Sequence, residues 1–98
     1  MFQNIKYFDW DTNKNKANLQ KHGVTFREAE GVFYDKYAVI ADDEEHSQDE
    51  DRFVIVGSSK QSRILLACYC IRHTDTVRII SARKATESEI DWYKEDWI

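Results

Sequence analysis

The stretch from Ile64 to Ile71, which reads ILLACYCI, restricts the fold of this chain most, because it contains no charged residue. A nearly uninterrupted apolar run of this length fits a strand that lies centrally in a sheet and is covered on both faces. We place that strand at Arg63 to Arg72. A hairpin-length connection, residues 58–61, links it to a strand expected at Arg52 to Gly57, and a second turn leads on to Val77 to Arg83. The sequence therefore predicts an antiparallel meander.

The segment before this meander carries the signals of a strand and a helix. Ile5 to Trp10 alternates as a strand does, and three good N-cap residues, Asp11, Thr12 and Asn13, follow it directly. A first helix should therefore run to about His22, where Gly23 provides the C-terminal cap. Residues 37–41 read as a brief strand, and the acidic run that follows has little to bury, so we expect it to be a loop.

Two further helices are expected from capping boxes, in which a threonine is followed three residues later by a glutamate. Thr25 with Glu28 begins a short second helix, and Thr86 with Glu89 begins a last helix from about Glu87. The apolar face of this last helix consists of Ile90, Tyr93 and Trp97. The order of elements predicts an α+β fold, a twisted antiparallel sheet packed with two N-terminal helices and one C-terminal helix.

Length and composition limit what such a chain can be. Its 98 residues, of which 42% are hydrophobic, suffice for one core, so we expect a single domain over residues 1–98. No window approaches the roughly 18 apolar residues of a membrane span, so we expect a soluble, unexported protein without a membrane partner. Cys68 and Cys70 share a strand face and are poorly placed to bridge, which favours buried thiols in a reducing cytoplasm. A metal site would need further ligands, so we expect no metal ion and no cofactor.

The net charge of −4 is unevenly distributed along the chain. Seven acidic residues fall between Asp42 and Asp51, and five more fall in the C-terminal helix pattern. The remaining residues, 1–41 and 52–86, hold thirteen Lys and Arg against six Asp and Glu. Because local charge governs the binding of phosphate groups, a basic body with two acidic attachments is compatible with a nucleic-acid partner. The alternative is a mixed, well-solvated surface.

The segment from Val77 to Glu89 is a candidate anion site. It sets Arg78, Arg83 and Lys84 into a strand pattern that runs directly into a helix cap. Arginines in an apolar strand are costly to bury unless a negative group meets them, and the free backbone amides of the helix start lie close by. Clustered cations at a strand end therefore predict binding of an anionic ligand.

Three blocks of the sequence together resemble a known family. They are FDWDTNKNKANLQKHGVTFREAEGVFYD (residues 8–35), HSQDEDRFVIVG (residues 46–57) and VRIISARKAT (residues 77–86). In order and spacing they look like the signature blocks of BrnT-type toxins of bacterial type II toxin-antitoxin systems, and the similarity covers nearly the whole chain. The resemblance implies a RelE-like fold and a ribonuclease that arrests translation. It also implies neutralisation by a BrnA antitoxin with a ribbon-helix-helix DNA-binding domain, in a hetero-oligomer that contacts DNA through the antitoxin and represses its own operon.

The chemistry of such an enzyme can be assigned to particular residues. Cleaving RNA without a metal ion requires deprotonation of the 2'-hydroxyl, protonation of the leaving oxygen and stabilisation of the extra charge on phosphorus. Arginine suits the last task, and four arginines are expected at or near strand ends, Arg52, Arg72, Arg78 and Arg83. In a regular strand Arg78 and Arg83 would point to opposite faces, so they share a site only if Arg83 has left the strand or a bulge intervenes. The alternative is that these arginines pair with Glu50, Asp75 or an acidic residue of the last helix.

The HSQDEDR block supplies candidates for proton transfer. His46 and Glu50 lie within seven residues of the chain together with Arg52, and histidine changes protonation near neutral pH. We therefore predict a catalytic set of Arg52, Arg78, Arg83, His46 and Glu50. The RNA-binding set is predicted to be Lys21, His22, Arg72 and Lys84.

Several residues of these types also have a structural interpretation. His22 ends a helix, where a cation is favoured electrostatically, so a capping role is an alternative to a role in the reaction. His73 falls in an expected turn and would be solvated. The tryptophans could stack on bases, but their apolar neighbours favour core positions for Trp10, Trp92 and Trp97.

Three classes of function follow from these observations. The first is a ribonuclease toxin that uses the basic rim as its active site. The second is a non-catalytic binding module, in which the same surface docks an antitoxin or DNA. The third is an enzyme inhibitor or degenerate toxin, which would act only through antitoxin binding and operon autoregulation and is suggested by the acidic balance of the chain.

Overall fold

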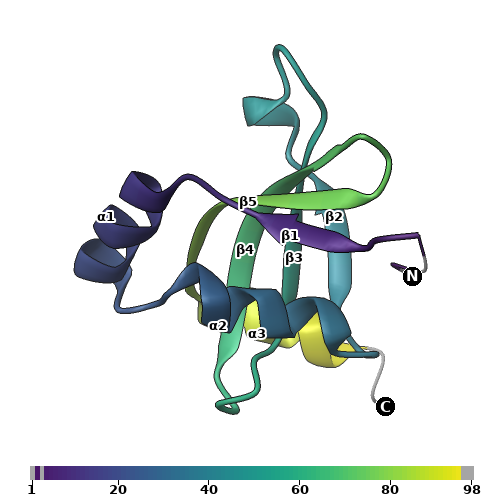
Figure 1. Cartoon of the computed structure of the whole chain (residues 1–98). Helices are drawn as coiled ribbons and strands as arrows, with labels where there is room; N and C mark the ends of the chain where they lie inside the picture. The colour runs from purple at the N-terminus through teal and green to yellow at the C-terminus, as the bar shows by residue number, and fades with distance from the viewer. Residues whose placement is uncertain (1, 3, 96–98) are drawn as a thin grey trace.

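The apolar run forms the central strand of the sheet. In the computed structural model, which describes residues 2 and 4–95, this strand is β4 (Ile64–Arg72). The strand order is β1-β5-β4-β3-β2, and β4 pairs antiparallel with both of its neighbours, as predicted (Figure 1). The first strand pairs parallel with β5, so the five-stranded sheet is mixed. The other strands are β1 (Tyr7–Asp9), β2 (Val39–Asp42), β3 (Arg52–Ser58) and β5 (Thr76–Lys84).

The helices begin at the predicted N-terminal caps, and α1 also ends at its predicted cap. The carboxylate of Asp11 accepts hydrogen bonds from the backbone at the start of α1 (Thr12–His22), and Gly23 ends this helix in the left-handed region, with φ of 69°. The second helix, α2 (Phe26–Glu30), continues into the 3-10 helix η1 (Gly31–Tyr34), and α3 (Glu87–Lys94) begins at the complete capping box of Thr86. Trp97, which we expected on the apolar face of α3, lies outside the described residues. No helix among residues 2 and 4–95 has the length and apolar character needed to cross a membrane.

One face of the sheet, the core face, carries the hydrophobic core. Alternate residues of the three central strands point to it and meet the apolar side of α2 and η1, where Phe26 and Val32 are fully buried. The ring of Phe33 packs edge-on against that of Tyr69, with centroids 4.9 Å apart. The strand residues of this core are Ile55, Leu65, Ala67, Tyr69, Val77, Ile79 and Ala82.

A bulge in β5 changes which residues share a face. Ile79 lies opposite Tyr69 and Ser81 lies opposite Cys68, so Ile80 has no partner in β4. The extra residue reverses the alternation of β5, which explains why Ile79 and Ala82, an odd number of positions apart, both reach the core. Residues on either side of the bulge therefore have to be assigned to faces through their partners in β4.

The first helix closes the part of the β5 edge that the short β1 leaves open. The buried side chain of Asn18 donates to the carbonyl oxygen of Ala82 at 2.7 Å and accepts from its N–H at 3.1 Å. It also donates to the carbonyl oxygen of Val24 at 2.9 Å. Figure 1 shows α1 beside the curved half of β5, where a neighbouring strand would otherwise lie. This amide satisfies backbone groups that would be costly to leave unpaired in the interior.

Two local expectations need correction. Only half of the capping box at Thr25 forms: its hydroxyl accepts from the N–H of Glu28, but the Glu28 carboxylate is buried and binds Ser59 and Arg63 instead. The acidic run was expected to be a plain loop, yet its first residue ends β2 and it contains the 3-10 helix η2 (Glu44–His46).

Candidate active site

The second face of the sheet carries the four arginines of the candidate site. Arg52 lies opposite Cys70, which lies opposite Arg78, so these three residues form a row across β3, β4 and β5. Arg72, two positions after Cys70 on the same strand, points to the same side. Arg83 lies opposite Leu66, an even number of positions from Cys70, so the bulge brings it to this face as well. We call this side of the sheet, which carries Arg52, Arg72, Arg78 and Arg83, the arginine face.

Two of these arginines are held by exposed ion pairs. Nη1 of Arg78 lies 3.2 Å from Oδ1 of Asp9, its neighbour in β1, and Nη2 of Arg72 lies 3.2 Å from Oε1 of Glu50. Pairs between partly exposed side chains contribute little to stability, so a phosphate can replace the carboxylate at small cost. These contacts hold both guanidinium groups on the arginine face but are weak enough for a ligand to replace them.

Arg83 is held more firmly and lies apart. Its Nη1 and Nη2 donate to the two carboxylate oxygens of Glu89 in α3, at 2.7 and 2.9 Å. This hydrogen-bonded pair lowers the pKa of Glu89 and raises that of Arg83. Leu66, the partner of Arg83, lies four positions along β4 from Cys70, which is in the row of Arg52 and Arg78, and this corresponds to about 13 Å along the strand. Arg83 therefore fastens α3 to the sheet at some distance from the other arginines.

The loop after β2 brings His46 to the edge of the arginine face. Nδ1 of His46 lies 3.0 Å from each carboxylate oxygen of Asp43. The loop is tied to the start of β3, because the N–H of Asp43 donates to the carbonyl oxygen of Arg52 at 2.8 Å and the Arg52 N–H donates to Oγ of Ser47 at 2.9 Å. The Asp43 carboxylate also accepts from the thiol of Cys68, at 3.4 Å. A histidine held by a carboxylate at Nδ1 keeps Nε2 for proton transfer.

His46, Glu50 and Arg52 line one hollow of about 310 Å³. The structure thus unites the three residues that the HSQDEDR block suggested. Within the described part of the chain, the buried Nε of Arg52 has no hydrogen-bond partner. The whole lining of this hollow consists of Glu45, His46, Gln48, Asp49, Glu50 and Arg52.

The cysteines of the arginine face are buried and free, as expected. Burial, together with the nearby Asp43 carboxylate, raises the pKa of the Cys68 thiol to about 12, and burial raises that of Cys70. Both therefore remain protonated at neutral pH, and a protonated thiol is a poor nucleophile or metal ligand. No cluster of three or more His, Cys, Asp or Glu suited to a metal ion occurs within residues 2 and 4–95.

The other predicted RNA contacts lie elsewhere. Lys21 and His22 are in the last turn of α1, beyond the edge of the sheet, and Lys84 lies opposite Leu65 and points to the side of the core face. His73 is exposed in the β4–β5 turn. These positions separate Lys21, His22 and Lys84 from the arginine face, where only Arg72 of the predicted RNA-binding set is found.

Trp10 packs at the edge of the core. The Trp10 ring meets the ring of Phe26 edge-on at 6.2 Å, and the Arg27 guanidinium lies over it at 5.4 Å. Trp92 is half-buried in α3.

One residue of the site was absent from the prediction. Asp43 contacts His46, yet in the sequence it is one of seven acidic residues in a run and shows no distinguishing neighbour. Asp43 could have been recognised from its position three residues before His46, because an aspartate at that spacing reaches the histidine ring across a single helical turn.

Comparison with known proteins shows the family of the chain and, separately, a similar fold. Residues 10–89 match the model of the family described as "Ribonuclease toxin, BrnT, of type II toxin-antitoxin system". The fold is similar to the crystal structure of the ribonuclease toxin BrnT of Brucella abortus, with a TM-score of 0.63 and 22% sequence identity over 83% of this chain and 97% of that one. Among curated proteins, none matches the chain.

Proposed function

We propose that this chain, which belongs to the BrnT family of ribonuclease toxins of type II toxin-antitoxin systems, cleaves RNA at the arginine face and thereby arrests translation. The observation that carries the proposal is the row of Arg52 and Arg78 across one side of the sheet, with His46 lining the same hollow as Arg52. Cations and a proton-transfer group are thus adjacent.

The arginines act on the phosphodiester. Arg52 and Arg78 are separated by one strand, which corresponds to about 10 Å between their backbones, so a phosphate above Cys70 is within reach of both side chains. Their guanidinium groups stabilise the additional negative charge of the transition state, as fixed cations do in other phosphoryl transfers. Arg72, one row further along the face, binds a neighbouring phosphate, and Glu50 positions it until RNA arrives.

His46 transfers the proton. With Nδ1 hydrogen-bonded to Asp43, the neutral ring accepts the proton of the 2'-hydroxyl at Nε2. The oxygen then attacks phosphorus, the bond from phosphorus to the 5'-oxygen breaks as a 2',3'-cyclic phosphate forms, and the 5'-oxygen takes a proton from solvent water. Since the arginines supply the positive charge, the reaction proceeds without a metal ion. In this scheme Arg83 positions α3 and takes no part in the reaction.

The partner of the toxin is an antitoxin, as its family implies. We infer that this antitoxin is a BrnA-like protein with a ribbon-helix-helix domain. The two proteins form a hetero-oligomer in the cytoplasm, and contact with DNA occurs through the antitoxin.

Cleavage of a labelled messenger RNA by the purified protein tests the proposal. We expect products that end in 2',3'-cyclic phosphate, activity that persists in EDTA, and no cleavage at a site whose 2'-hydroxyl is replaced by hydrogen. His46→Ala and Arg52→Ala should each reduce cleavage at least about a hundredfold, because each removes a group that acts in the transition state. Lys36→Ala, which removes an exposed cation outside the arginine face, is the matched control and should cleave as the wild type does.

A non-catalytic binding module remains the second candidate, because Arg72, Arg78 and Arg83 are each already paired with a carboxylate. The same variants decide between the two. If purified wild-type protein leaves RNA intact while binding its antitoxin, and Arg52→Ala weakens that binding, the arginine face is an interface and the ribonuclease proposal is wrong.

A further inference from the structure

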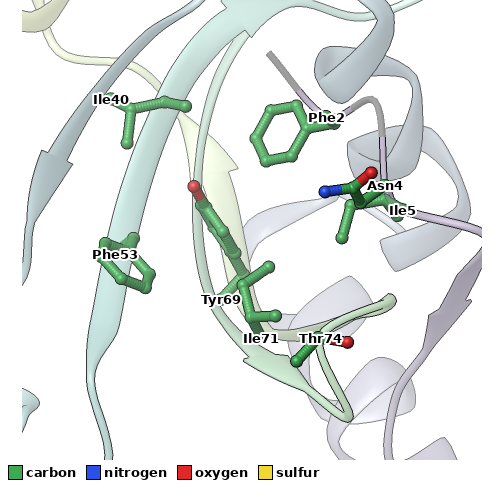
Figure 2. A pocket seen from close by; sticks show the side chains of 8 residues that line it. All are labelled: Phe2, Asn4, Ile5, Ile40, Phe53, Tyr69, Ile71 and Thr74. Carbon is green, nitrogen blue, oxygen red and sulfur yellow. The ribbon is translucent and has the colours of Figure 1, made fainter.

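The core face has an apolar hollow at the end remote from α1, which no helix or strand of residues 2 and 4–95 covers. It measures about 650 Å³, and Figure 2 shows Ile40 and Phe53 on one side of it, Phe2 and Ile5 on the other, and Tyr69 between them. The remaining lining residues are Asn4, Ile71 and Thr74. Ile71 keeps 38% of its surface exposed although it belongs to the central strand. A continuous apolar surface of this kind is typical of a site that another molecule covers.

The hollow adjoins an open edge of the sheet. The edge strand β2 pairs with β3 on one side, and no described strand pairs with its other side (Figure 1). Ile40 points from this strand into the hollow. An unpaired edge beside an apolar pocket is the arrangement in which proteins bind an extended segment as an additional strand, since the backbone pairs with the edge while alternate side chains enter the pocket.

The negative charge beside this edge indicates which side chains a bound extended segment would carry. Asp42 lies two positions after Ile40, points to the same face and is exposed. An adjoining hollow shares Phe53 with the apolar one, and three of its other five lining residues are acidic: Asp42, Glu44 and Asp51, beside Ser47 and Arg52. A strand added to β2 would place side chains two residues apart beside Ile40 and Asp42, so an apolar residue and a Lys or Arg fit these two positions.

We propose that β2 and the apolar hollow dock an extended segment of a partner protein, with an apolar side chain in the hollow and a basic side chain beside Asp42. This identification of the partner rests on the proposed function: the segment belongs to the antitoxin. The hollow lies on the core face and the arginine face lies on the opposite side of the sheet, so the docked strand does not occupy the space above Arg52 and Arg78.

Calorimetric titration of the purified protein with its purified cognate antitoxin tests the docking site. Ile71→Glu should weaken binding at least about tenfold, because it places a charge in the apolar contact. Leu19→Glu is the matched control: Leu19 is another exposed apolar residue, 47% exposed, on α1, and its substitution should leave the affinity within about twofold. Asp42→Lys should also weaken binding and should reduce the dependence of the affinity on salt concentration.

Hydrogen exchange of the wild-type complex gives a second measurement that does not depend on the folding of a variant. Antitoxin binding should slow the exchange of the β2 amides, and unchanged exchange there would overturn the proposal. So would an unchanged affinity of a folded Ile71→Glu variant. If the protein alone sediments as a dimer and Ile71→Glu makes it monomeric, a second copy occupies the hollow and the antitoxin assignment is wrong.

RNA cleavage measured without antitoxin separates this inference from the proposed function. Ile71→Glu should cleave RNA as the wild type does, since the substitution lies on the core face. If the wild type does not cleave RNA but Ile71→Glu still weakens antitoxin binding, the docking site stands and the ribonuclease proposal fails.

Discussion

Arg78 and Arg83 lie on the same face of the sheet although they are five positions apart in one strand. Ile80 causes this, because it is the one residue between them that has no partner in β4. Without the bulge one of the two arginines would point into the hydrophobic core, where an unpaired charge is very costly. The bulge therefore lets a single strand contribute both Ile79 to the core and two arginines to the opposite face.

The two arginines should nevertheless respond differently to substitution. Arg78→Ala should reduce RNA cleavage about a hundredfold or more with little change in melting temperature, because its partner Asp9 is half exposed. Arg83→Ala should lower the free energy of unfolding by about 1–2 kcal/mol, because it leaves Glu89 and the start of α3 without their guanidinium partner. Cleavage assays and thermal unfolding of both variants check this division.

Lys60→Ala, which removes an exposed cation from the β3–β4 turn, is the control for the loss of charge alone. Equal loss of cleavage in folded Arg78→Ala and Arg83→Ala would mean that the two arginines act together, and the assignment of Arg83 to α3 would be wrong.

We expect Asp43 to affect RNA cleavage by positioning His46. Asp43→Asn keeps the size of the side chain but removes the charge that holds Nδ1, so kcat for RNA cleavage should fall about tenfold or more while KM stays nearly unchanged. Glu44→Gln removes the next carboxylate of the acidic run and is the matched control.

A double variant distinguishes positioning from a general structural effect of Asp43. If Asp43 acts only through the histidine, Asp43→Asn combined with His46→Ala should cleave no more slowly than His46→Ala alone. Additive losses, or a lower melting temperature that accounts for the loss of activity, would contradict the positioning role.

The features that the sequence predicted correctly depend on neighbouring residues. Asp11, Gly23 and Thr86 cap helices as expected, and the apolar run became the central strand, because caps and periodicity act over a few positions of the chain. The parallel pairing of β1 with β5 is a non-local contact, and no local pattern specifies it.

The features that escaped prediction join distant parts of the chain. The Glu28 carboxylate binds Arg63, 35 positions away, and Ser59 instead of completing its capping box. A buried carboxylate is stabilised more by a guanidinium and a hydroxyl group than by one backbone N–H. The sequence indicated that a bulge could bring Arg78 and Arg83 to one face, but it did not give the position of the bulge. That position, Ile80, depends on the packing of Ile79 and Ala82 in the core.

Asn18 should contribute to stability more than its helix neighbours. Asn18→Ala leaves the N–H and the carbonyl oxygen of Ala82 without their partner in the interior, so we expect the free energy of unfolding to fall by about 2–3 kcal/mol. Denaturant unfolding measures this change. Asn13→Ala, an exposed position of the same helix, should change it by less than about 0.5 kcal/mol, and similar losses in both variants would refute the edge-closing role of Asn18.

The stability contributed by Glu28 should disappear in acid. Its pKa is held below the ordinary value of 4.5, chiefly by the hydrogen bond from Arg63, so the folded protein binds this proton less readily than the unfolded chain. The contribution is therefore complete above about pH 4.5 and is lost as the pH falls through the lower pKa of the folded state. At pH 7 Glu28→Gln should be less stable than the wild type by about 2 kcal/mol, and the difference in melting temperature should shrink steadily below pH 4.5. Glu30→Gln, at the end of the same helix, is the control, and a difference for Glu28→Gln that stays constant from pH 7 to pH 3 would show that the ionised carboxylate is not its source.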